Sequence, residues 1–230
     1  SSVKRVFSSV KSIVNLAIRE QGLTVTNVFS GTFIPDDGVK QLRNPIPTEA
    51  LQRVQLDCQN LDDEARWLIT LISDTGMRLS EACGLLVSDI YVDATTPFVD
   101  LKEHPWRRLK TASSQRQIPL VGFSLWAAKR VGLSPSGFAF PKYCNEEKCN
   151  SNSASATLNK WLKPRVPPGC VIHSFRHSLR DRLRAIECPA EIIDAIGGWA
   201  TDGIGHKYGM GYDLGVKHRW ISRICKNTIE

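Results

Sequence analysis

The chain lacks several features that would each point to a particular class of protein. Its 230 residues contain no hydrophobic run long enough to cross a membrane, and no basic stretch and apolar core mark a signal peptide. There is no internal repeat, no low-complexity tract, no G-x-x-x-x-G-K-[ST] phosphate loop and no dinucleotide-binding fingerprint. No acidic cluster of the kind that holds metal ions is evident. We therefore expect a soluble, intracellular protein that uses neither a nucleotide cofactor nor a metal.

The cysteines lack the pattern of a disulfide framework. There are seven, an odd number at irregular spacings, which is unlike a small secreted domain and fits a reducing compartment. Cys144 and Cys149 are the one close pair, and neither a second pair nor suitably spaced histidines completes a zinc site. The cysteines are therefore expected to be incidental.

Basic residues outnumber acidic ones. Lysine and arginine number 30 against 23 aspartates and glutamates, a formal net charge of +7. This excess favours an anionic partner, and nucleic acid is the commonest one. The length suits one sizeable core with a small appendage.

The spacing of apolar residues predicts an α+β fold that is mainly α-helical, with one small antiparallel sheet. An amphipathic helix is predicted over residues 4–21, ending at Gly22. A linker rich in glycine, proline and aspartate follows at residues 31–47, and the body runs from residue 48 to 230. In the body, Thr48 is suited to cap the first helix, which carries Leu51, and Gly76 interrupts the chain after the second. Further helices are predicted at about residues 79–86, 122–131, 153–163, 174–186, 189–197 and 213–226, and strands at 89–92, 98–102 and 115–120.

Four groups of residues in the body suit attack on a phosphodiester. Arginine presents a planar fork of donors that matches two phosphate oxygens, and a tyrosine hydroxyl can act as a covalent nucleophile once its proton is removed. In chain order the groups are Thr75-Gly-Met-Arg78-Leu-Ser-Glu81, the run from Lys110 to Leu120, His173-Ser-Phe-Arg176-His177, and Gly198-Trp199 followed by Tyr208.

These four groups resemble the motifs of the tyrosine recombinases of the phage integrase family. In that family they read T-G-x-R-x-x-E, K-T-x-x-S-x-R-x-[IV]-P-L, H-x-[LF]-R-H, and G-[HW] before the nucleophilic tyrosine. The resemblance runs over most of the chain and implies that residues 48–230 form the tyrosine-recombinase catalytic domain. Residues 1–30 resemble the last helix of the N-terminal core-binding domain that clamps DNA, whose earlier helices are absent.

The resemblance also implies a role for each site residue. Arg78 and Arg176 are expected to hold the non-bridging phosphate oxygens and to stabilise the transition state. Lys110 is expected to protonate the departing 5′ oxygen, although a basic residue on an exposed turn is the plain alternative. His173 is suited to take the proton of the tyrosine. Trp199 stands where histidine is commoner, and its indole donates but cannot shuttle a proton.

Two further residues are expected behind these groups. Glu81 follows Arg78 by three residues and is expected to orient an arginine or the histidine, with a surface ion pair as the alternative. His177 is expected to pack or hydrogen-bond behind Arg176.

Tyr208 is the predicted nucleophile. It follows Trp199 by nine residues, which is the family spacing, whereas Tyr212 comes one helical turn later. Tyr212 is also followed by Asp213, whose charge would repel a phosphate. Tyr91 and Tyr143 are expected to be ordinary strand or loop residues.

The resemblance implies a site-specific DNA recombinase that forms a 3′-phosphotyrosyl intermediate and a four-way (Holliday) junction on double-stranded DNA. Two alternatives remain open: a type IB topoisomerase-like relaxing enzyme, and a catalytically silent DNA-binding protein. We expect four protomers in the synapse, joined through the C-terminal helix, which would otherwise pack on its own core. The expected location is the cytoplasm, in association with the DNA of a prokaryote or phage.

Overall fold

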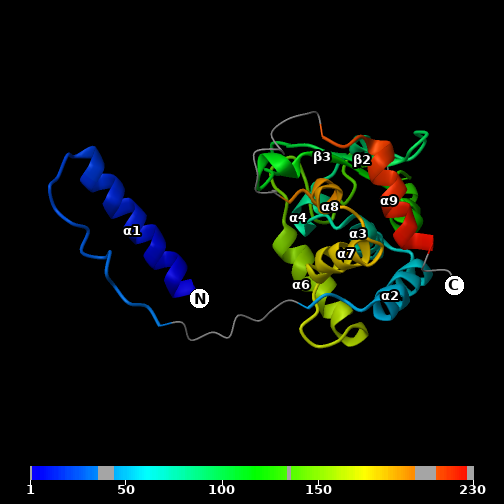
Figure 1. Cartoon of the computed structure of the whole chain (residues 1–230), viewed down its shortest axis with the longest axis horizontal. Coiled ribbons are helices and arrows are strands. Elements are labelled where there is room, and N and C mark those ends of the chain that lie inside the picture. Colours follow the sequence, from blue (N-terminus) through cyan, green and yellow to red (C-terminus); the bar gives the residue numbers. More distant parts are fainter. Residues whose placement is uncertain (1, 36–43, 134–135, 200–210, 227–230) are drawn as a thin grey trace. The chain divides into compact units, whose positions relative to one another are not determined.

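The structure is a computed structural model that describes residues 2–35, 44–133, 136–199 and 211–226 (Figure 1). The chain divides into two compact units, Ser1–Leu42 and Arg43–Glu230, which are described separately below. Within the described residues, no helix is long and apolar enough to cross a membrane.

The first unit is a single helix with a returning segment. Helix α1 spans Ser2–Glu20, close to the predicted helix, and the chain turns at Gly22, where φ is +60°. Asn27 fastens the returning segment, since its side-chain amide donates to the Lys11 carbonyl oxygen at 3.0 Å. Several large apolar side chains of α1 are nevertheless exposed, namely Val3, Val6, Ile13 and Leu16.

The second unit is mainly helical, as predicted. Its described helices are α2 (Thr48–Leu61), α3 (Glu64–Thr75), α4 (Leu79–Cys83), α5 (Gly122–Val131), α6 (Ser151–Leu162), α7 (Ser174–Ala185), α8 (Ala190–Gly197) and α9 (Leu214–Lys226). Short 3-10 turns lie at Val87–Asp89, Ala112–Ser114 and Lys163–Arg165.

The three predicted strands form one antiparallel sheet in the order β1-β2-β3. The strands are β1 (Ile90–Tyr91), β2 (Phe98–Leu101) and β3 (Arg116–Pro119). Val99 lies opposite Ile118, and both are fully buried, so this face of the sheet packs into the core. The connection between β2 and β3 spans residues 102–115 and carries Lys110.

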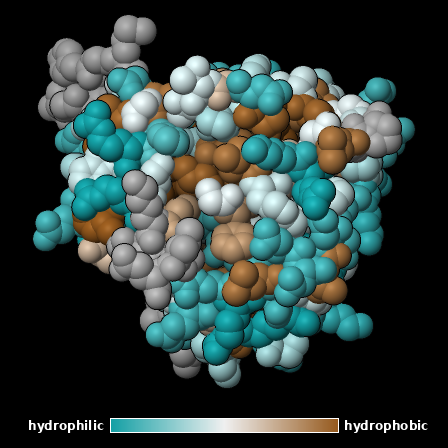
Figure 2. Space-filling model, turned by 90° about the vertical axis from the view of Figure 1, so that its right-hand side faces the viewer, coloured by the Kyte–Doolittle hydropathy of each residue, from teal (hydrophilic) through white to brown (hydrophobic). Residues whose placement is uncertain are grey.

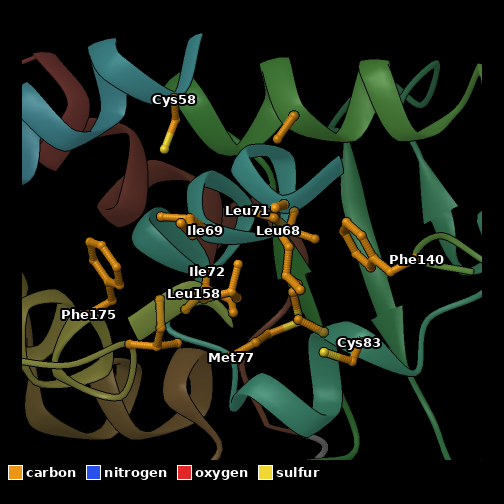
Figure 3. Packing of buried hydrophobic residues seen from close by; sticks show 14 of the residues in the cluster. Cys58, Leu68, Ile69, Leu71, Ile72, Met77, Cys83, Phe140, Leu158 and Phe175 are labelled. Atoms are coloured by element: carbon orange, nitrogen blue, oxygen red, sulfur yellow. The ribbon is translucent and has the colours of Figure 1, made fainter. Parts of the chain in front are cut away.

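Helix α3 lies at the centre of the core. It contacts α2, α5 and α7, and its side chains from Leu68 to Thr75 are all buried. Figure 3 shows Leu68 and Ile69 of α3 between Phe140 on one side and Phe175 on the other. A second cluster joins α7, α8 and α9 through Leu179, Ile192 and Ile221.

Two local predictions are corrected. Thr48 does not cap α2 but is its first residue, and Pro47 occupies the N-cap position without a side-chain hydrogen bond. The helix predicted at 79–86 ends at Cys83. The following leucines instead form extended pairing with residues 137–139, since the Leu85 carbonyl accepts from the Ala139 N–H at 2.9 Å. Backbone groups held in this pairing cannot continue the helix.

Helix α9 packs on the chain that carries it. It contacts β3, α7 and α8, and Ile221 and Ile224 are buried there. The side of the molecule that carries α2 and α9 shows hydrophobic surface between hydrophilic regions (Figure 2). An apolar surface hollow of about 350 Å³ lies beside α9, lined by Pro97, Leu120, Val121, Gly122, Leu125, His218, Ser222 and Cys225.

Candidate active site

The first arginine is placed by the end of one helix and the start of the next. Gly76 ends α3 in the left-handed conformation, with φ of +61°, and a Cβ added there would lie 2.5 Å from Leu179. Glycine is therefore required at this position. Arg78 has an extended backbone and occupies the N-cap position of α4, and its backbone N–H donates to Glu81 Oε2 at 2.9 Å.

Glu81 holds two arginines at once. Its carboxylate is 2% exposed, pairs with Arg78 Nη1 and lies 3.3 Å from Arg116 Nη2. Burial raises the pKa of Glu81, but the charge of Arg116 and the hydrogen bonds and charge of Arg78 outweigh it, so the pKa lies below its usual value. Glu81 is thus an ionised, buried partner and not the surface ion pair of the plain alternative.

The connection that carries Lys110 is tied to the same arginine. Ser114 lies at the end of this connection, and its hydroxyl accepts from Arg78 Nη1 at 3.0 Å. The Thr111 hydroxyl lies 3.0 Å from that of Ser114. Lys110 directly precedes this turn, and its side chain is exposed to solvent.

Arg176, on α7, reaches the turn that precedes Arg78. It is 3% exposed, and its Nη1 donates to the Gly76 carbonyl oxygen at 2.7 Å, while its Nη2 has no hydrogen-bond partner in the described part of the chain. Burial, and then the charges of Arg78 and Arg116, lower the pKa of Arg176 to about 9. A buried guanidinium with an unused donor and positive neighbours is an electrostatic site for an anion.

Trp199 lies against two of the four arginines of α7. Its ring lies 4.2 Å from Arg176 Cζ and 4.8 Å from Arg180 Cζ. Gly198 precedes it with φ of +63°, and a Cβ there would lie 2.6 Å from Arg116 Nη1. The indole therefore fixes the direction of Arg176 through packing and cation–π contact.

The two histidines share the start of α7. His173 occupies the N-cap position and is half-buried, and its ring centroid lies 5.3 Å from that of His177 in an edge-on arrangement. His177 is exposed, which corrects the expectation that it packs behind Arg176. His177 shares a helix face with Asp181 and Arg184, four and seven residues later, and all three are exposed, so this face of α7 points to solvent.

The family of the chain follows from a comparison of its sequence with models of known families. The model of the phage integrase family matches residues 45–210, which is most of the chain. The chain belongs to the phage integrase family. No curated protein matches its sequence.

Solved integrases share the fold. The chain is similar to the Tn1549 transposon integrase in complex with a circular intermediate DNA, with a TM-score of 0.61 and 18% identity over 97% of this chain and 79% of that one. For the integrase from mycobacterium phage Brujita these values are 0.55, 15%, 95% and 70%. For the XerH site-specific recombinase bound to its difH substrate they are 0.52, 17%, 85% and 55%. The predicted fold, a mainly helical tyrosine-recombinase catalytic fold with a small antiparallel sheet, is confirmed.

Three of the four tyrosines of this integrase-family chain lie within the residues that the structure describes. Tyr208, the predicted nucleophile, lies outside the described residues. Tyr212 donates its hydroxyl to Glu191 Oε2, and this hydrogen bond raises the pKa of Tyr212. Tyr91 stacks on Phe98 in the sheet with ring centroids 4.5 Å apart, and Tyr143 is buried.

Arg116 also belongs to this cluster of side chains, and the sequence alone gave it no role. Besides Glu81, its Nε donates to the Ile196 carbonyl oxygen at 2.8 Å and its Nη1 to the Ser114 carbonyl oxygen at 2.6 Å. It therefore joins β3, α4, α8 and the connection that carries Lys110. The signal for it was its position two residues before the buried Ile118, which puts it on the same face of the strand, where a charged group needs a partner.

Proposed function

We propose that this integrase-family chain is a site-specific DNA recombinase that cleaves and rejoins strands through a 3′-phosphotyrosyl intermediate. The observation that carries the proposal is the placement of two arginines against one turn of backbone. Arg176 is fixed on the Gly76 carbonyl, and Arg78, two residues later, is fixed on Glu81. Each guanidinium retains donors that can reach a phosphate.

The proposed reaction conserves the energy of the phosphodiester. The Tyr208 oxygen attacks phosphorus and the bond to the 5′ oxygen breaks, which leaves a tyrosyl phosphodiester and a free 5′ hydroxyl. His173 receives the tyrosine proton, and Lys110 supplies a proton to the departing oxygen. Rejoining reverses each transfer, so no nucleotide is consumed.

The arginines are proposed to stabilise the charge that develops in the transition state. Preorganised donors in a water-poor site contribute several kcal/mol, and the loss of one such donor costs about 100- to 1,000-fold in rate. Arg176 meets the condition of preorganisation, since Gly76 and Trp199 hold it from two sides. Trp199 itself is proposed to act by position and packing.

The choice of Tyr208 over Tyr212 is supported by the neighbourhood of Tyr212. Its hydroxyl is engaged by Glu191, and a raised pKa makes the phenolate harder to form. A carboxylate beside the hydroxyl would also repel a phosphate.

Double-stranded DNA is the proposed substrate, with four protomers in the synapse and the protein located on the DNA of a cell's cytoplasm. We place residues 1–30 in the DNA clamp, residues 31–47 in the linker and residues 48–230 in the catalytic domain. Helix α9 is the proposed link between protomers. Ile221 and Ile224 are already buried within their own chain. Docking of α9 on a neighbouring protomer would therefore replace this packing with the same packing between two protomers.

Covalent trapping tests the proposal. The chain is incubated, in the presence of EDTA, with a pool of randomised duplexes that carry a bridging 5′-phosphorothiolate, and adducts are separated on an SDS gel. We expect an adduct that Tyr208→Phe abolishes and that the matched variant Tyr212→Phe retains. Persistence of the adduct in Tyr208→Phe would overturn the nucleophile. Absence of any adduct would favour the silent DNA-binding alternative.

Relaxation and strand exchange separate the two enzymatic alternatives. A recombinase joins strands from two duplexes that carry the trapped sequence. A chain that relaxes supercoiled plasmid and never joins two duplexes would instead be a topoisomerase-like enzyme.

A further inference from the structure

Three cysteine thiols that are far apart in the sequence meet behind helix α4. Cys83 is the last residue of α4, whereas Cys144 and Cys149 belong to the segment that leads into α6. The thiols of Cys83 and Cys144 both lie within hydrogen-bonding reach of the Cys149 thiol. The expectation that the cysteines are incidental did not foresee this cluster, because only the 144–149 pair is close in the sequence. Within the described residues no group of three His, Cys, Asp or Glu side chains could hold a metal ion.

Cys144 and Cys149 lie directly opposite each other on two short antiparallel segments. On the side of the pair away from the turn, the Asn150 N–H donates to the Tyr143 carbonyl oxygen at 2.7 Å. On the side toward the turn, the Asn145 N–H donates to the Lys148 carbonyl oxygen at 3.1 Å. The cysteines are therefore a non-hydrogen-bonded pair, in which Cα atoms are about 4.5 Å apart and both side chains share one face. Disulfides span Cα separations of about 4.4–6.8 Å, so this pair can close with little movement.

A buried arginine lies against the thiols. Arg107 is 3% exposed, and none of its three guanidinium nitrogens has a hydrogen-bond partner within the described residues. Its positive charge lowers the pKa of both the Cys149 and the Cys144 thiol. A buried guanidinium without a partner is costly, and an adjacent thiolate reduces that cost.

Cys149 is the thiol best placed to ionise. It lies before the first turn of α6, where the backbone N–H of Ser151 faces its sulfur, and it is partly exposed. The hydrogen bond from Cys83 lowers the pKa of Cys149 to about 7, against the effect of burial and with help from Cys144, Arg107 and the Ser151 amide. The pKa values of the other two thiols are raised. The hydrogen bond to Cys149 and burial raise the pKa of Cys83. Burial raises the pKa of Cys144 to about 12.

We propose that Cys149 is a peroxide-reactive thiolate and that its oxidation is followed by a reversible disulfide with Cys144. In the first step the Cys149 sulfur attacks a peroxide oxygen, the O–O bond breaks, and the products are a sulfenic acid and, after protonation, an alcohol or water. In the second step the Cys144 sulfur attacks the Cys149 sulfur, the S–OH bond breaks, and hydroxide leaves as water with the Cys144 proton. The two thiols have then lost two electrons to the peroxide, and an external dithiol returns them.

The reactive pair lies beside α4, the helix at whose N-cap position Arg78 stands. Cys149 Sγ lies 3.9 Å from the carbonyl oxygen of Ser80, two residues after Arg78 in the sequence. The inference does not depend on recombinase activity, because it concerns the thiols alone.

Tryptic mapping of the full chain tests the disulfide. Cleavage after Lys142, Lys148 and Lys160 places Cys144 in peptide 143–148 and Cys149 in peptide 149–160, whereas Cys83 falls in peptide 79–102. The reduced protein is treated with hydrogen peroxide, its remaining thiols are alkylated, and the digest is analysed by mass spectrometry without reductant. We expect a link between peptides 143–148 and 149–160 that disappears with dithiothreitol and in Cys149→Ser. A link from 149–160 to 79–102 in its place would overturn the pairing.

The alkylation rate of each cysteine tests the thiolate. Cys188 is the internal control, since burial raises its pKa to about 11. At pH 7 we expect iodoacetamide to modify Cys149 at least about tenfold faster than Cys188, because the thiolate is the reacting form. Equal rates in the folded protein would overturn the proposal whatever disulfides form at high peroxide.

Discussion

The carboxylate of Glu81 is almost fully buried between Arg78 and Arg116. Glu81→Gln keeps the shape of the side chain but leaves both guanidinium groups without a counter-charge. Breaking a buried ion pair from one side costs about 3–5 kcal/mol. We expect a loss of this order in the free energy of unfolding, measured with urea at pH 7, together with loss of covalent trapping.

The pH dependence of this effect follows from the lowered pKa of Glu81. In the unfolded chain the carboxyl titrates near its ordinary value of 4.5, and in the folded chain it titrates lower. The stabilisation is therefore complete above pH 4.5 and is lost as the pH falls through the folded value. The difference in unfolding free energy between wild type and Glu81→Gln should narrow below pH 4.5. A difference that stays constant down to the acid transition would contradict the assignment.

Trp199 has a counterpart elsewhere in the chain that serves as its control. Arg176 and Arg180 lie over the Trp199 ring, and Arg66 and Arg165 lie over the Trp161 ring at 4.8 and 4.1 Å. Each cation–π contact contributes about 0.5–2 kcal/mol. Replacing either tryptophan with leucine should lower stability by a similar amount.

The two leucine variants should differ in covalent trapping. We expect Trp199→Leu to slow it about tenfold, the equivalent of about 1.4 kcal/mol, and Trp161→Leu to leave its rate unchanged. Equal trapping rates in the two variants would show that Trp199 has no positioning role.

The motifs predicted the residues of the candidate site whose chemistry is distinctive, and they missed those whose role depends on packing. Arg78, Arg176 and Trp199 were predicted from motifs, and the structure brings the second arginine and the indole together. The role of Arg116 depends on the Glu81 carboxylate and the Ile196 carbonyl oxygen, which lie far from it in the sequence and which no spacing along the chain encodes. The exposure of His177 follows from which face of α7 packs on the core, and that is a property of the folded protein.

At the scale of elements, the end of α8 is set by a glycine that cannot be replaced without displacing Arg116. Gly198→Ala adds a Cβ 2.6 Å from Arg116 Nη1 and 2.9 Å from the Ser113 carbonyl oxygen, at φ of +63°. Gly211 has φ of +76° and no atom within 4 Å of an added Cβ, so it is a matched control. The left-handed conformation costs a non-glycine residue about 1–2 kcal/mol.

Both alanine variants should therefore lose about this much stability, and Gly198→Ala should lose more. Urea unfolding measures the two losses. Only Gly198→Ala should also reduce covalent trapping, because only this variant displaces Arg116. Equal stability losses would mean that Arg116 moves aside freely.

Element type was predictable in this chain, and element length was less so. The strands at 90–91, 98–101 and 116–119 fell inside the predicted runs, because alternating apolar residues report one buried face. Helix α4 was predicted too long, because Leu85 and Leu86 are equally suited to helix or extended pairing. The partner that decided the matter, residues 137–139, lies some fifty positions away.

For the whole molecule, the two hydrophobic clusters draw on the second unit alone. Among the described residues, neither cluster contains one that precedes Ile46. A chain that starts at Arg43 should unfold at the same urea concentration as the longer chain, measured by tryptophan fluorescence. A chain that ends before Leu214 is the control, since it loses Ile221 and Ile224 and should unfold at a lower concentration. A lower midpoint for the chain that starts at Arg43 would mean that the first unit supports the second.

The central position of α3 has a consequence for biosynthesis. Its surface is completed by α7, which begins 99 residues after Thr75 at Ser174. Ribosomes add about 5–20 residues per second, so the helix emerges about 5–20 seconds before its last neighbour. During that interval α2, then α4 and later α5, are the partners already synthesised. The nascent chain should therefore be a client of chaperones that bind exposed apolar helices, and slow translation should lengthen that dependence.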